Sequence, residues 1–324
     1  MKRLLSALLV WCLLLPCAGA FAIATPRVIP VLAQEDIPAT PHGIRNYLLL
    51  CVDSWNGKAD NLGNTDGMVL VTADEDMGKI SLTSFTRDLL VKNPEKSGYN
   101  RLSRYVINNG ADKEAVEKLV GIYETHFGIR IEKYILVNWT GVANIIDALG
   151  GVELTLTNGE AIRLKDKQAY MSNWAVPELR GAGTYRLRGY PAVIYMRIRS
   201  ETPVGGEQYD YRRTTRARNV VSSLANSLRE ISWSDALSLA TVTVWQSIAA
   251  TNMTLADMLE AASYAFSLRN AEIEQLRIPI NGTGREFIYM EMATQQIDVP
   301  ANREALQQFL FDSYTVRGDD EGWD

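Results

Sequence analysis

Four short apolar runs, each bounded by turn residues, recur in the first half of the chain. They are NYLLLCVD (46–53), GMVLVTAD (67–74), KISLTSF (79–85) and KYILVN (133–138). Runs of this length that stay apolar are typical of strands covered on both faces. The pattern therefore predicts a sheet buried between two layers, and VELTL (152–156) predicts a further strand.

Segments with helical periodicity separate these runs. In KEAVEKLVGIYETHFG (113–128) apolar residues recur every three or four positions and predict one buried stripe. WTGVANIIDALGG (139–151) predicts a short helix that ends at two glycines. Further on, Thr254 and Asp257 form an approximate capping box. The remaining predicted elements are helices at 219–231, 233–250, 255–268 and 303–311, and strands at 272–280 and 285–292. This alternation predicts an α/β fold, a three-layer α-β-α sandwich with a mixed central sheet.

The two ends of the chain differ in character from its middle. Residues 1–22 begin with two cations, continue as an apolar run and end on small residues, as a cleaved secretory signal or a retained membrane anchor does. Both alternatives place the rest of the chain outside the cytoplasm, anchored at the membrane or secreted. Residues 23–45 are proline-rich and predict an extended linker. We expect one domain at 46–312, followed by an acidic tail at 313–324.

The charge distribution is uneven. The chain has net charge −5, and without residues 1–22 it has 31 cations against 38 acids, or −7. Yet nine arginines lie between Arg180 and Arg218, against three acids. An exported, acidic domain with one local basic segment does not fit a nucleic-acid-binding protein. With Cys51 as the single cysteine beyond residue 22 and only two histidines in the chain, disulfides, zinc motifs and histidine-based catalysis are also poor candidates.

Two aspartates stand at the ends of neighbouring predicted strands. Asp53 ends the first apolar run and Asp66 precedes the second, so their carboxylates are expected to converge at one edge of the sheet. Two convergent carboxylates suit Mg²⁺, which completes its shell with water and phosphate oxygens, and Mn²⁺ is the alternative metal. The competing interpretation is that each aspartate caps a turn. Arg87 and Asp88 follow the third run at another strand end, where they form either part of the site or a surface ion pair.

The arginine-rich segment predicts an anion site. Arg197 and Arg199, two residues apart, would point from one face of an extended segment. Asp210, Arg213 and Arg216 recur every three residues on a predicted helix and lie on or beside its inward face. Buried charges need partners, and one carboxylate cannot satisfy four arginines, whereas a pyrophosphate could. A solvated helix face accounts for Arg212 and Arg218.

At this point the sequence resembles the LytR–CpsA–Psr (LCP) family. The similar segments, in order, are NYLLLCVDS, NTDGMVLVTAD, KISLTSFTRDLLV, NRLSRYVINNG, IDALGGVEL, LRGYPAVIYMRIRS and DYRRTTRARNVV, and VPANREALQQFLF is similar to the end of that domain. The resemblance implies an enzyme, an extracytoplasmic phosphotransferase with a possible pyrophosphatase side activity. It would move a glycopolymer such as teichoic acid from a polyprenyl-pyrophosphate carrier, at the membrane surface, to a hydroxyl of peptidoglycan.

The resemblance also implies roles for individual residues. Asp53 and Asp66 would hold the Mg²⁺, and one of the two carboxylates would take the acceptor proton. The phosphates would be bound by Arg87, Arg101, Arg197, Arg199, Arg213 and Arg216, with Asp210 orienting Arg213. The sequence departs from the family pattern at Cys51, Trp55, Asn64, Gly67, Thr86 and Ala217. These departures leave a second interpretation open, a non-catalytic protein that binds polyprenyl phosphate or the cell wall.

Overall fold

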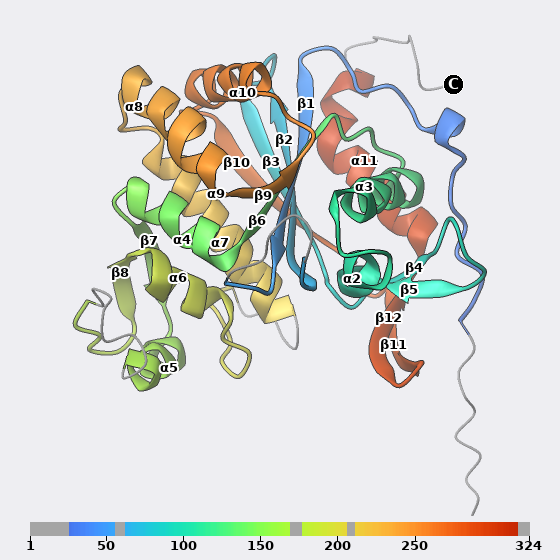
Figure 1. Ribbon diagram of the computed structural model, residues 1–324, viewed down its shortest axis with the longest axis horizontal. Helices are drawn as coiled ribbons and strands as arrows, with labels where there is room; N and C mark the ends of the chain where they lie inside the picture. Colours follow the sequence, from blue (N-terminus) through green and yellow to red (C-terminus); the bar gives the residue numbers. More distant parts are fainter. Residues whose placement is uncertain (1–25, 56–61, 169–176, 206–210, 317–324) are drawn as a thin grey trace, which may run out of the picture.

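A mixed sheet of six strands forms the centre of the computed structural model, which describes residues 26–55, 62–168, 177–205 and 211–316 (Figure 1). The strand order is β10-β3-β2-β1-β6-β9. The strands are β1 (Ile44–Val52), β2 (Thr65–Asp74), β3 (Lys79–Phe85), β6 (Lys133–Asn138), β9 (Ile248–Thr251) and β10 (Glu272–Ile278). β1 pairs antiparallel with β2 and parallel with β6, and β10 runs parallel to β3.

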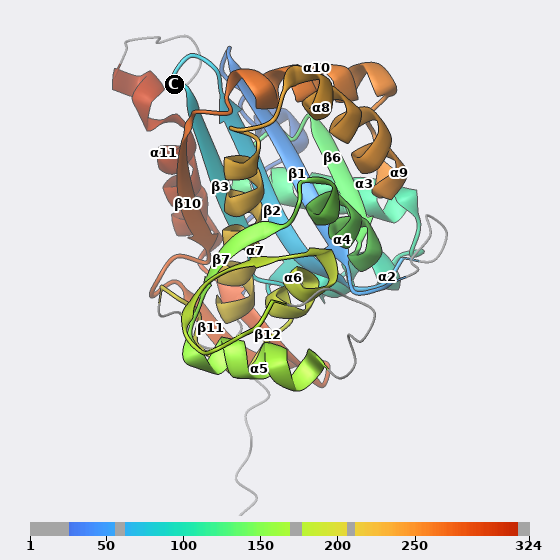
Figure 2. The ribbon, with the colours of Figure 1, turned by 90° about the vertical axis from the view of Figure 1, so that its left-hand side faces the viewer.

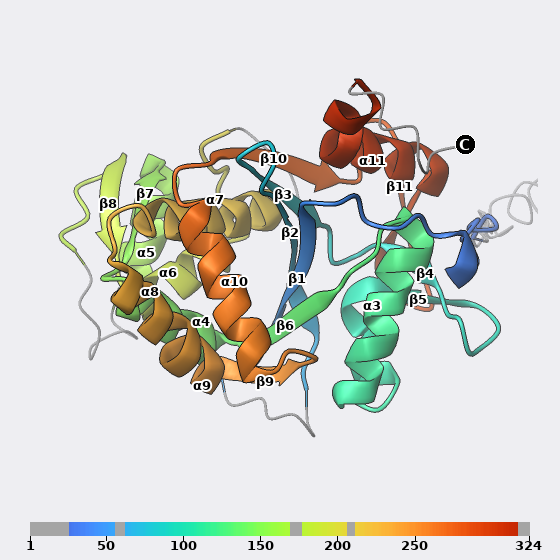
Figure 3. The same ribbon diagram turned by 90° about the horizontal axis from the view of Figure 1, so that it is seen from above.

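Helices cover both faces of this sheet, as Figure 3 shows from above. One layer contains η2 (Leu102–Arg104), α2 (Tyr105–Asn108), α3 (Lys113–Phe127) and α11 (Val299–Val316). The other contains α4 (Trp139–Ala148), α6 (Gly189–Met196), α7 (Tyr211–Ser227), α8 (Trp233–Ser238), η3 (Leu239–Val244), α9 (Trp245–Ser247) and α10 (Leu255–Ser267). The predicted three-layer sandwich with a mixed central sheet is therefore confirmed.

Smaller elements surround the sandwich. The strands β7 (Val152–Leu156) and β8 (Gly183–Leu187) pair antiparallel, and α5 (Asn158–Gln168) lies between them in the sequence; Figure 2 shows β7 next to α5 and α7. On the other side lie two hairpins and a short helix: β4 (Leu90–Lys92) with β5 (Tyr99–Arg101), β11 (Gly284–Tyr289) with β12 (Met292–Ile297), and η1 (Gln34–Asp36).

The two faces of the sheet are filled differently. Along β1, every second residue is fully buried, including Leu48 and Leu50, and these side chains belong to the large core under α3. The alternate residues Leu49 and Cys51 face the α7 layer and are only half-buried. Both faces are apolar, as the sequence predicts, but the α7 side is incompletely filled.

Local sequence signals explain where several helices begin and end. The side chain of Asp112 accepts a hydrogen bond from the backbone of Ala115 at the start of α3, and Gly128 ends that helix at φ 64°. At α10, Thr254 and Asp257 make the predicted capping box. These caps place the boundaries of both helices within a residue of the prediction.

Two predicted segments differ in the structure. Residues 233–250 are not one helix: they form α8, η3 and α9 in turn, and the last residues join β9 because the edge of β6 offers unpaired backbone groups. The single strand predicted at 285–292 is the hairpin β11–β12, which turns at Met290 and Glu291 with φ of 47° and 63°.

The predicted linker packs against the domain where the structure describes it, from residue 26 onward. Ile29 and Ile37 are buried, and Arg130 donates hydrogen bonds to the backbone carbonyls of Gln34 and Ile37. The predicted signal or anchor at 1–22 lies outside the described residues, as does the end of the acidic tail. Within the described part of the chain, no helix is long and apolar enough to cross a membrane.

Candidate anion-binding site

Asp53 and Asp66 meet at one edge of the sheet, as their positions at strand ends predict. Asp53 directly follows β1, and Asp66 is the second residue of β2, the antiparallel neighbour. Both line one cavity of about 710 Å³, which we call the charged cavity. Its charged lining residues are Asp53, Asp66, Arg163, Lys167, Arg197, Arg199 and Arg213. Five cations thus surround two carboxylates.

Asp66 is the centre of an ion-pair network. Its Oδ1 accepts a hydrogen bond from Nη1 of Arg87 at 2.9 Å, and its Oδ2 accepts one from Nη2 of Arg213 at 2.7 Å. Burial alone would raise the pKa of Asp66, but the Arg213 and Arg87 guanidiniums outweigh it and hold this pKa below its ordinary value. The carboxylate is therefore ionised at neutral pH and holds both arginines in place.

Arg213 keeps donor capacity for a ligand. Its Nη1 atom is buried and has no hydrogen-bond partner among the described residues. A buried guanidinium nitrogen without an acceptor is costly, so an anion in the cavity would relieve that cost. Asp210, which the sequence suggested as the residue that orients Arg213, lies outside the described residues. In the described part, Asp66 has that orienting function.

Asp53 is held by one neutral neighbour. Its Oδ1 accepts from the backbone N–H of Asn64 at 2.7 Å, and its Oδ2 accepts from Nδ2 of Asn64 at 3.0 Å. A Cβ on Gly63 would lie 2.5 Å from Oδ1, so glycine is needed at that position. No cation pairs with Asp53 among the described residues. Asn64, a departure from the family pattern, thus has a role that sequence reasoning missed.

Arg197 and Arg199 line the charged cavity from the end of α6. Arg197 caps that helix with helical backbone angles, so the expected extended segment is instead a turn that directs both residues to the same cavity. The Arg197 guanidinium lies 3.7 Å from the ring centre of Trp139. Partial burial and the nearby Arg213 cation lower the pKa of Arg197. Neither arginine forms an ion pair with a described residue, which leaves both charges available to a ligand.

Arg87 and Arg101 belong to a chain of ion pairs that begins at Asp66. Besides Asp66, Arg87 contacts Asp88, whose carboxylate also pairs with Arg101. Neither arginine is among the residues that line the charged cavity. The four residues form one chain of alternating charge that supports Asp66, and direct contact of Arg87 or Arg101 with a ligand stays a prediction.

The structure corrects the interpretation of Arg216. This side chain is fully buried, and its guanidinium bonds Glu160, the carbonyl of Ile198 and the carbonyl of Glu201. It lines neither the charged cavity nor the apolar one described below, so the structure gives Arg216 a structural role in place of the predicted contact with substrate. Arg218, expected on a solvated face, is also buried, against Ser84 and Gln275. Sequence reasoning missed both sets of partners because they come from distant elements.

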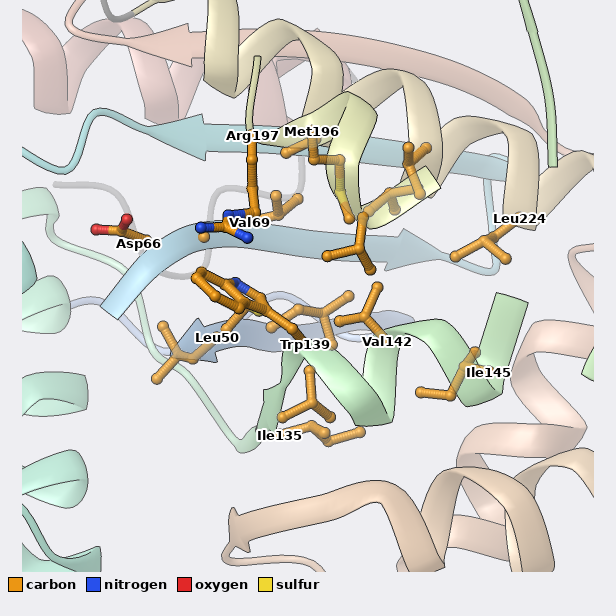
Figure 4. A pocket seen from close by; sticks show the side chains of 18 of the residues that line it. Leu50, Asp66, Val69, Ile135, Trp139, Val142, Ile145, Met196, Arg197 and Leu224 are labelled. Carbon is orange, nitrogen blue, oxygen red and sulfur yellow. The ribbon is translucent and has the colours of Figure 1, made fainter. Parts of the chain in front are cut away.

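An apolar cavity of about 310 Å³ opens beside the charged one, between the sheet and α4, α6 and α7. Figure 4 shows it from close by: Asp66 and Arg197 lie at one end, and Ile145 and Leu224 at the other. Asp66, Trp139, Arg197 and Arg213 line both cavities. No single stretch of sequence reveals this cavity, because its walls come from strands and helices far apart along the chain.

The residues of the charged cavity fit a Mg²⁺ ion that takes only one or two carboxylate ligands from the protein. Within the described residues, no three His, Cys, Asp or Glu side chains are grouped so that they could hold a metal ion. Mg²⁺ often takes only one or two carboxylates and completes its shell with phosphate oxygens and water. Asp53 suits this role because its charge has no cationic partner among the described residues, whereas Asp66 already pairs with two arginines.

The fold and the site together define the class of protein: it is an α/β sandwich in which a cationic cavity adjoins an apolar one. Residues 33–306 match the family model described as LytR_cpsA_psr family, and the chain belongs to that family.

Biofilm regulatory protein A of Streptococcus mutans is 28% identical over 190 residues, which are 56% of this chain and 44% of that protein. Polyisoprenyl-teichoic acid–peptidoglycan teichoic acid transferase TagU of Bacillus cereus is 26% identical over 257 residues, 78% of this chain and 75% of that protein.

A solved structure supports the fold. The LytR-CPS2A-psr family protein YwtF (TagT), with bound octaprenyl pyrophosphate lipid, matches with a TM-score of 0.59 at 19% identity. The match covers 86% of this chain and 98% of that one. The fold expected from the resemblance is thereby confirmed.

Proposed function

We propose that this chain is an extracytoplasmic phosphotransferase that moves a glycopolymer from a polyprenyl-pyrophosphate carrier to a hydroxyl of peptidoglycan. The observation that carries the proposal is the junction of the two cavities at Asp66, Arg197 and Arg213. A ligand that fits both must have an apolar tail joined directly to a strongly anionic group. A polyprenyl pyrophosphate has this composition, and the names of TagU and of the octaprenyl-pyrophosphate complex of TagT agree with it.

The charges of the site match a pyrophosphate. Arg197 and Arg199 have no carboxylate partner among the described residues, and Arg213 has a free buried nitrogen. Guanidinium groups donate paired hydrogen bonds to phosphate oxygens, which makes arginine suited to such a ligand. Asp66 prevents Arg213 from turning away, so the donor is positioned before the ligand arrives.

The reaction would proceed by in-line displacement. The acceptor hydroxyl oxygen attacks the phosphorus next to the sugar, and the bond from that phosphorus to the bridging oxygen breaks. Polyprenyl phosphate leaves with the bond's electron pair, and the hydroxyl proton passes to a carboxylate, for which Asp53 is the candidate because, among the described residues, it forms no ion pair with a cationic side chain. The arginines stabilise the charge that develops on the phosphate oxygens.

A divalent cation is part of the proposal. Asp53, with Asp66 beside it, would hold Mg²⁺ or Mn²⁺, which would neutralise phosphate charge during the transfer. The chain's own contribution is to fix Asp53 through Asn64 and to fix the arginines through Asp66.

The experiment is a transfer assay with the full chain in detergent. Polyprenyl-pyrophosphate-linked sugar, Mg²⁺ and peptidoglycan are supplied, and release of polyprenyl phosphate and sugar attachment are measured. We expect Arg213→Ala to lower the rate by about 100-fold or more, the size of losing one positioned donor. Arg180→Ala, which removes an exposed ion pair with Glu178, is the matched control and should be unaffected.

The same assay separates the alternative function. Wild-type protein that binds the lipid without releasing product would select the non-catalytic binding protein. Wild-type protein that binds no polyprenyl pyrophosphate would reject the transferase, and a protein that also binds neither polyprenyl phosphate nor peptidoglycan would reject the alternative.

A further inference from the structure

Three aromatic rings form a cluster that includes Trp139, a residue that lines the charged cavity. The Trp55 ring stacks on Tyr190 with 4.7 Å between ring centres and 19° between planes. The Trp55 ring also contacts Trp139 edge-on, with 5.2 Å between ring centres and 70° between the ring planes. All three side chains are half-buried, so part of each ring reaches solvent. The cluster combines segments far apart in sequence: the residues after β1, the start of α4 and the first turn of α6.

The cluster is continuous with the cavity wall. Trp139 lines the charged cavity and carries the Arg197 guanidinium on its ring. Tyr190 lies four residues before Ile194 on α6, and Ile194 also lines that cavity. A molecule that extends from Arg197 along this wall would therefore meet Trp139 and then the other two rings.

The rings are not needed to fix the backbone at this point. Two hydrogen bonds already join the segment after β1 to α4: the backbone N–H of Trp139 donates to the carbonyl of Ser54 at 2.9 Å, and the Thr140 hydroxyl donates to the carbonyl of Trp55 at 2.7 Å. Aromatic side chains that stay partly exposed beside a polar cavity are typical of binding surfaces. The three rings therefore suit a ligand group that has an apolar face.

The chemistry of a lipid pyrophosphate identifies that group. With the tail in the apolar cavity and the pyrophosphate at Asp66, Arg197 and Arg213, the next covalent unit enters the charged cavity. The cavity's volume of about 710 Å³ leaves room beyond a pyrophosphate. In a lipid-linked glycan this unit is a sugar. The C–H face of a pyranose ring packs well on an aromatic face, whose π-electrons carry negative potential.

We propose that Trp55, Trp139 and Tyr190 form a saccharide subsite that stacks on the sugar attached directly to the pyrophosphate. The inference rests on the proposed function and adds to it: this chain recognises the first sugar of its substrate through aromatic rings, beyond the contacts of its arginines with phosphate. Trp55 and Tyr190 are then specificity-determining residues, and their contribution appears only when the ligand carries a sugar.

The experiment compares two ligands on the full chain. One is undecaprenyl pyrophosphate, and the other is the same lipid with one N-acetylhexosamine on the pyrophosphate. We expect wild-type protein to bind the sugar-bearing lipid more tightly. Trp55→Ala and Tyr190→Ala should each weaken binding of that lipid about five- to tenfold, the size of one aromatic contact, without changing affinity for the sugar-free lipid. Trp55→Phe and Tyr190→Phe keep a ring and should retain most of the preference.

Trp233→Ala is the matched control, because Trp233 is a partly exposed tryptophan that packs on Phe266 in a different part of the fold. If Trp55→Ala lowers the affinity for both lipids equally, the ring only supports the structure. If Trp55→Ala and Tyr190→Ala keep the wild-type preference for the sugar-bearing lipid, the subsite is also overturned. Wild-type protein that binds the sugar-free lipid but shows no preference overturns the subsite alone. Protein that binds neither lipid overturns the proposed function with it.

Discussion

Asp66 and Arg213 form the central contact of the site: Oδ2 of Asp66 lies 2.7 Å from Nη2 of Arg213, with both side chains largely buried. The contact joins the start of β2 to the first turn of α7, residues 147 positions apart in sequence. It holds a cation at the mouth of the apolar cavity, and one buried nitrogen of this cation, Nη1, has no acceptor in the part of the chain that the structure describes. The ligand site is therefore part of what stabilises the fold.

This contact predicts a pH-dependent stability. Because the pKa of Asp66 is lower in the folded protein than its ordinary value of 3.8, its ionised form stabilises the fold above pH 3.8, and this stabilisation is lost as the pH falls through the folded-state pKa. We expect Asp66→Asn to reduce the free energy of unfolding by about 1–3 kcal/mol near neutral pH. The difference from wild type should shrink steadily below pH 3.8.

Urea unfolding of both proteins over this pH range measures the effect. Glu178→Gln is the control, since it removes an exposed carboxylate paired with Arg180 and should change stability little at any pH. A difference between Asp66→Asn and wild type that stays constant down to strongly acidic pH would contradict the assignment of the effect to this carboxylate.

The position of the two aspartates could be predicted from sequence because it depends on local rules. An apolar run ends in Asp53, the next begins after Asp66, and antiparallel neighbours bring the end of one strand to the start of the other. The arginine pattern on α7 also predicted correctly that Arg213 and Arg216 point inward. For these two arginines helical periodicity was enough to predict direction, but it failed for Arg218, which the same pattern placed on a solvated face and which is buried.

The same pattern could not predict what satisfies the inward charges. Glu160, the partner of Arg216, lies on α5, 56 residues earlier, and no spacing rule connects the two positions. The apolar cavity escapes prediction for a related reason. It is the space left between β1, β2, α4, α6 and α7, so it depends on how separate elements pack and not on any one of them.

Arg216 is expected to affect stability rather than ligand contact. Arg216→Ala would leave the fully buried Glu160 carboxylate without its cation and should lower the free energy of unfolding by about 3–5 kcal/mol. Urea unfolding without ligand measures this. The double variant Glu160→Leu with Arg216→Met removes both charges and should recover much of the loss. Wild-type stability in Arg216→Ala, together with lost lipid binding, would instead support the ligand role suggested by the sequence.

The apolar cavity makes binding depend on the length of the lipid. Ala217 lines it from α7, and Ala217→Trp would fill part of its volume of about 310 Å³. We expect affinity for undecaprenyl pyrophosphate to fall about tenfold or more, while affinity for dimethylallyl pyrophosphate, whose short chain needs little of the cavity, stays unchanged. Ser222→Trp is the matched control, because Ser222 lies on the same helix but lines a separate polar cleft. Equal losses for both lipids would contradict a tail-binding role.

The last prediction concerns Asn64, which holds both carboxylate oxygens of Asp53. Asn64→Ala keeps the backbone donor but loses the side-chain donor, so the carboxylate should become less well oriented. If Asp53 holds Mg²⁺, we expect the Mg²⁺ concentration for half-maximal binding to rise about tenfold, as is typical when a residue that orients a metal ligand is lost. Gly63→Ala should act similarly, because its Cβ would lie 2.5 Å from Oδ1 of Asp53.

Calorimetric titration of Mg²⁺ into the complex with undecaprenyl pyrophosphate measures the effect without relying on turnover. Unchanged Mg²⁺ affinity in Asn64→Ala and in Asp53→Asn would show that the cation is not held here, and the charge of the pyrophosphate would then be balanced by Arg197, Arg199 and Arg213 alone.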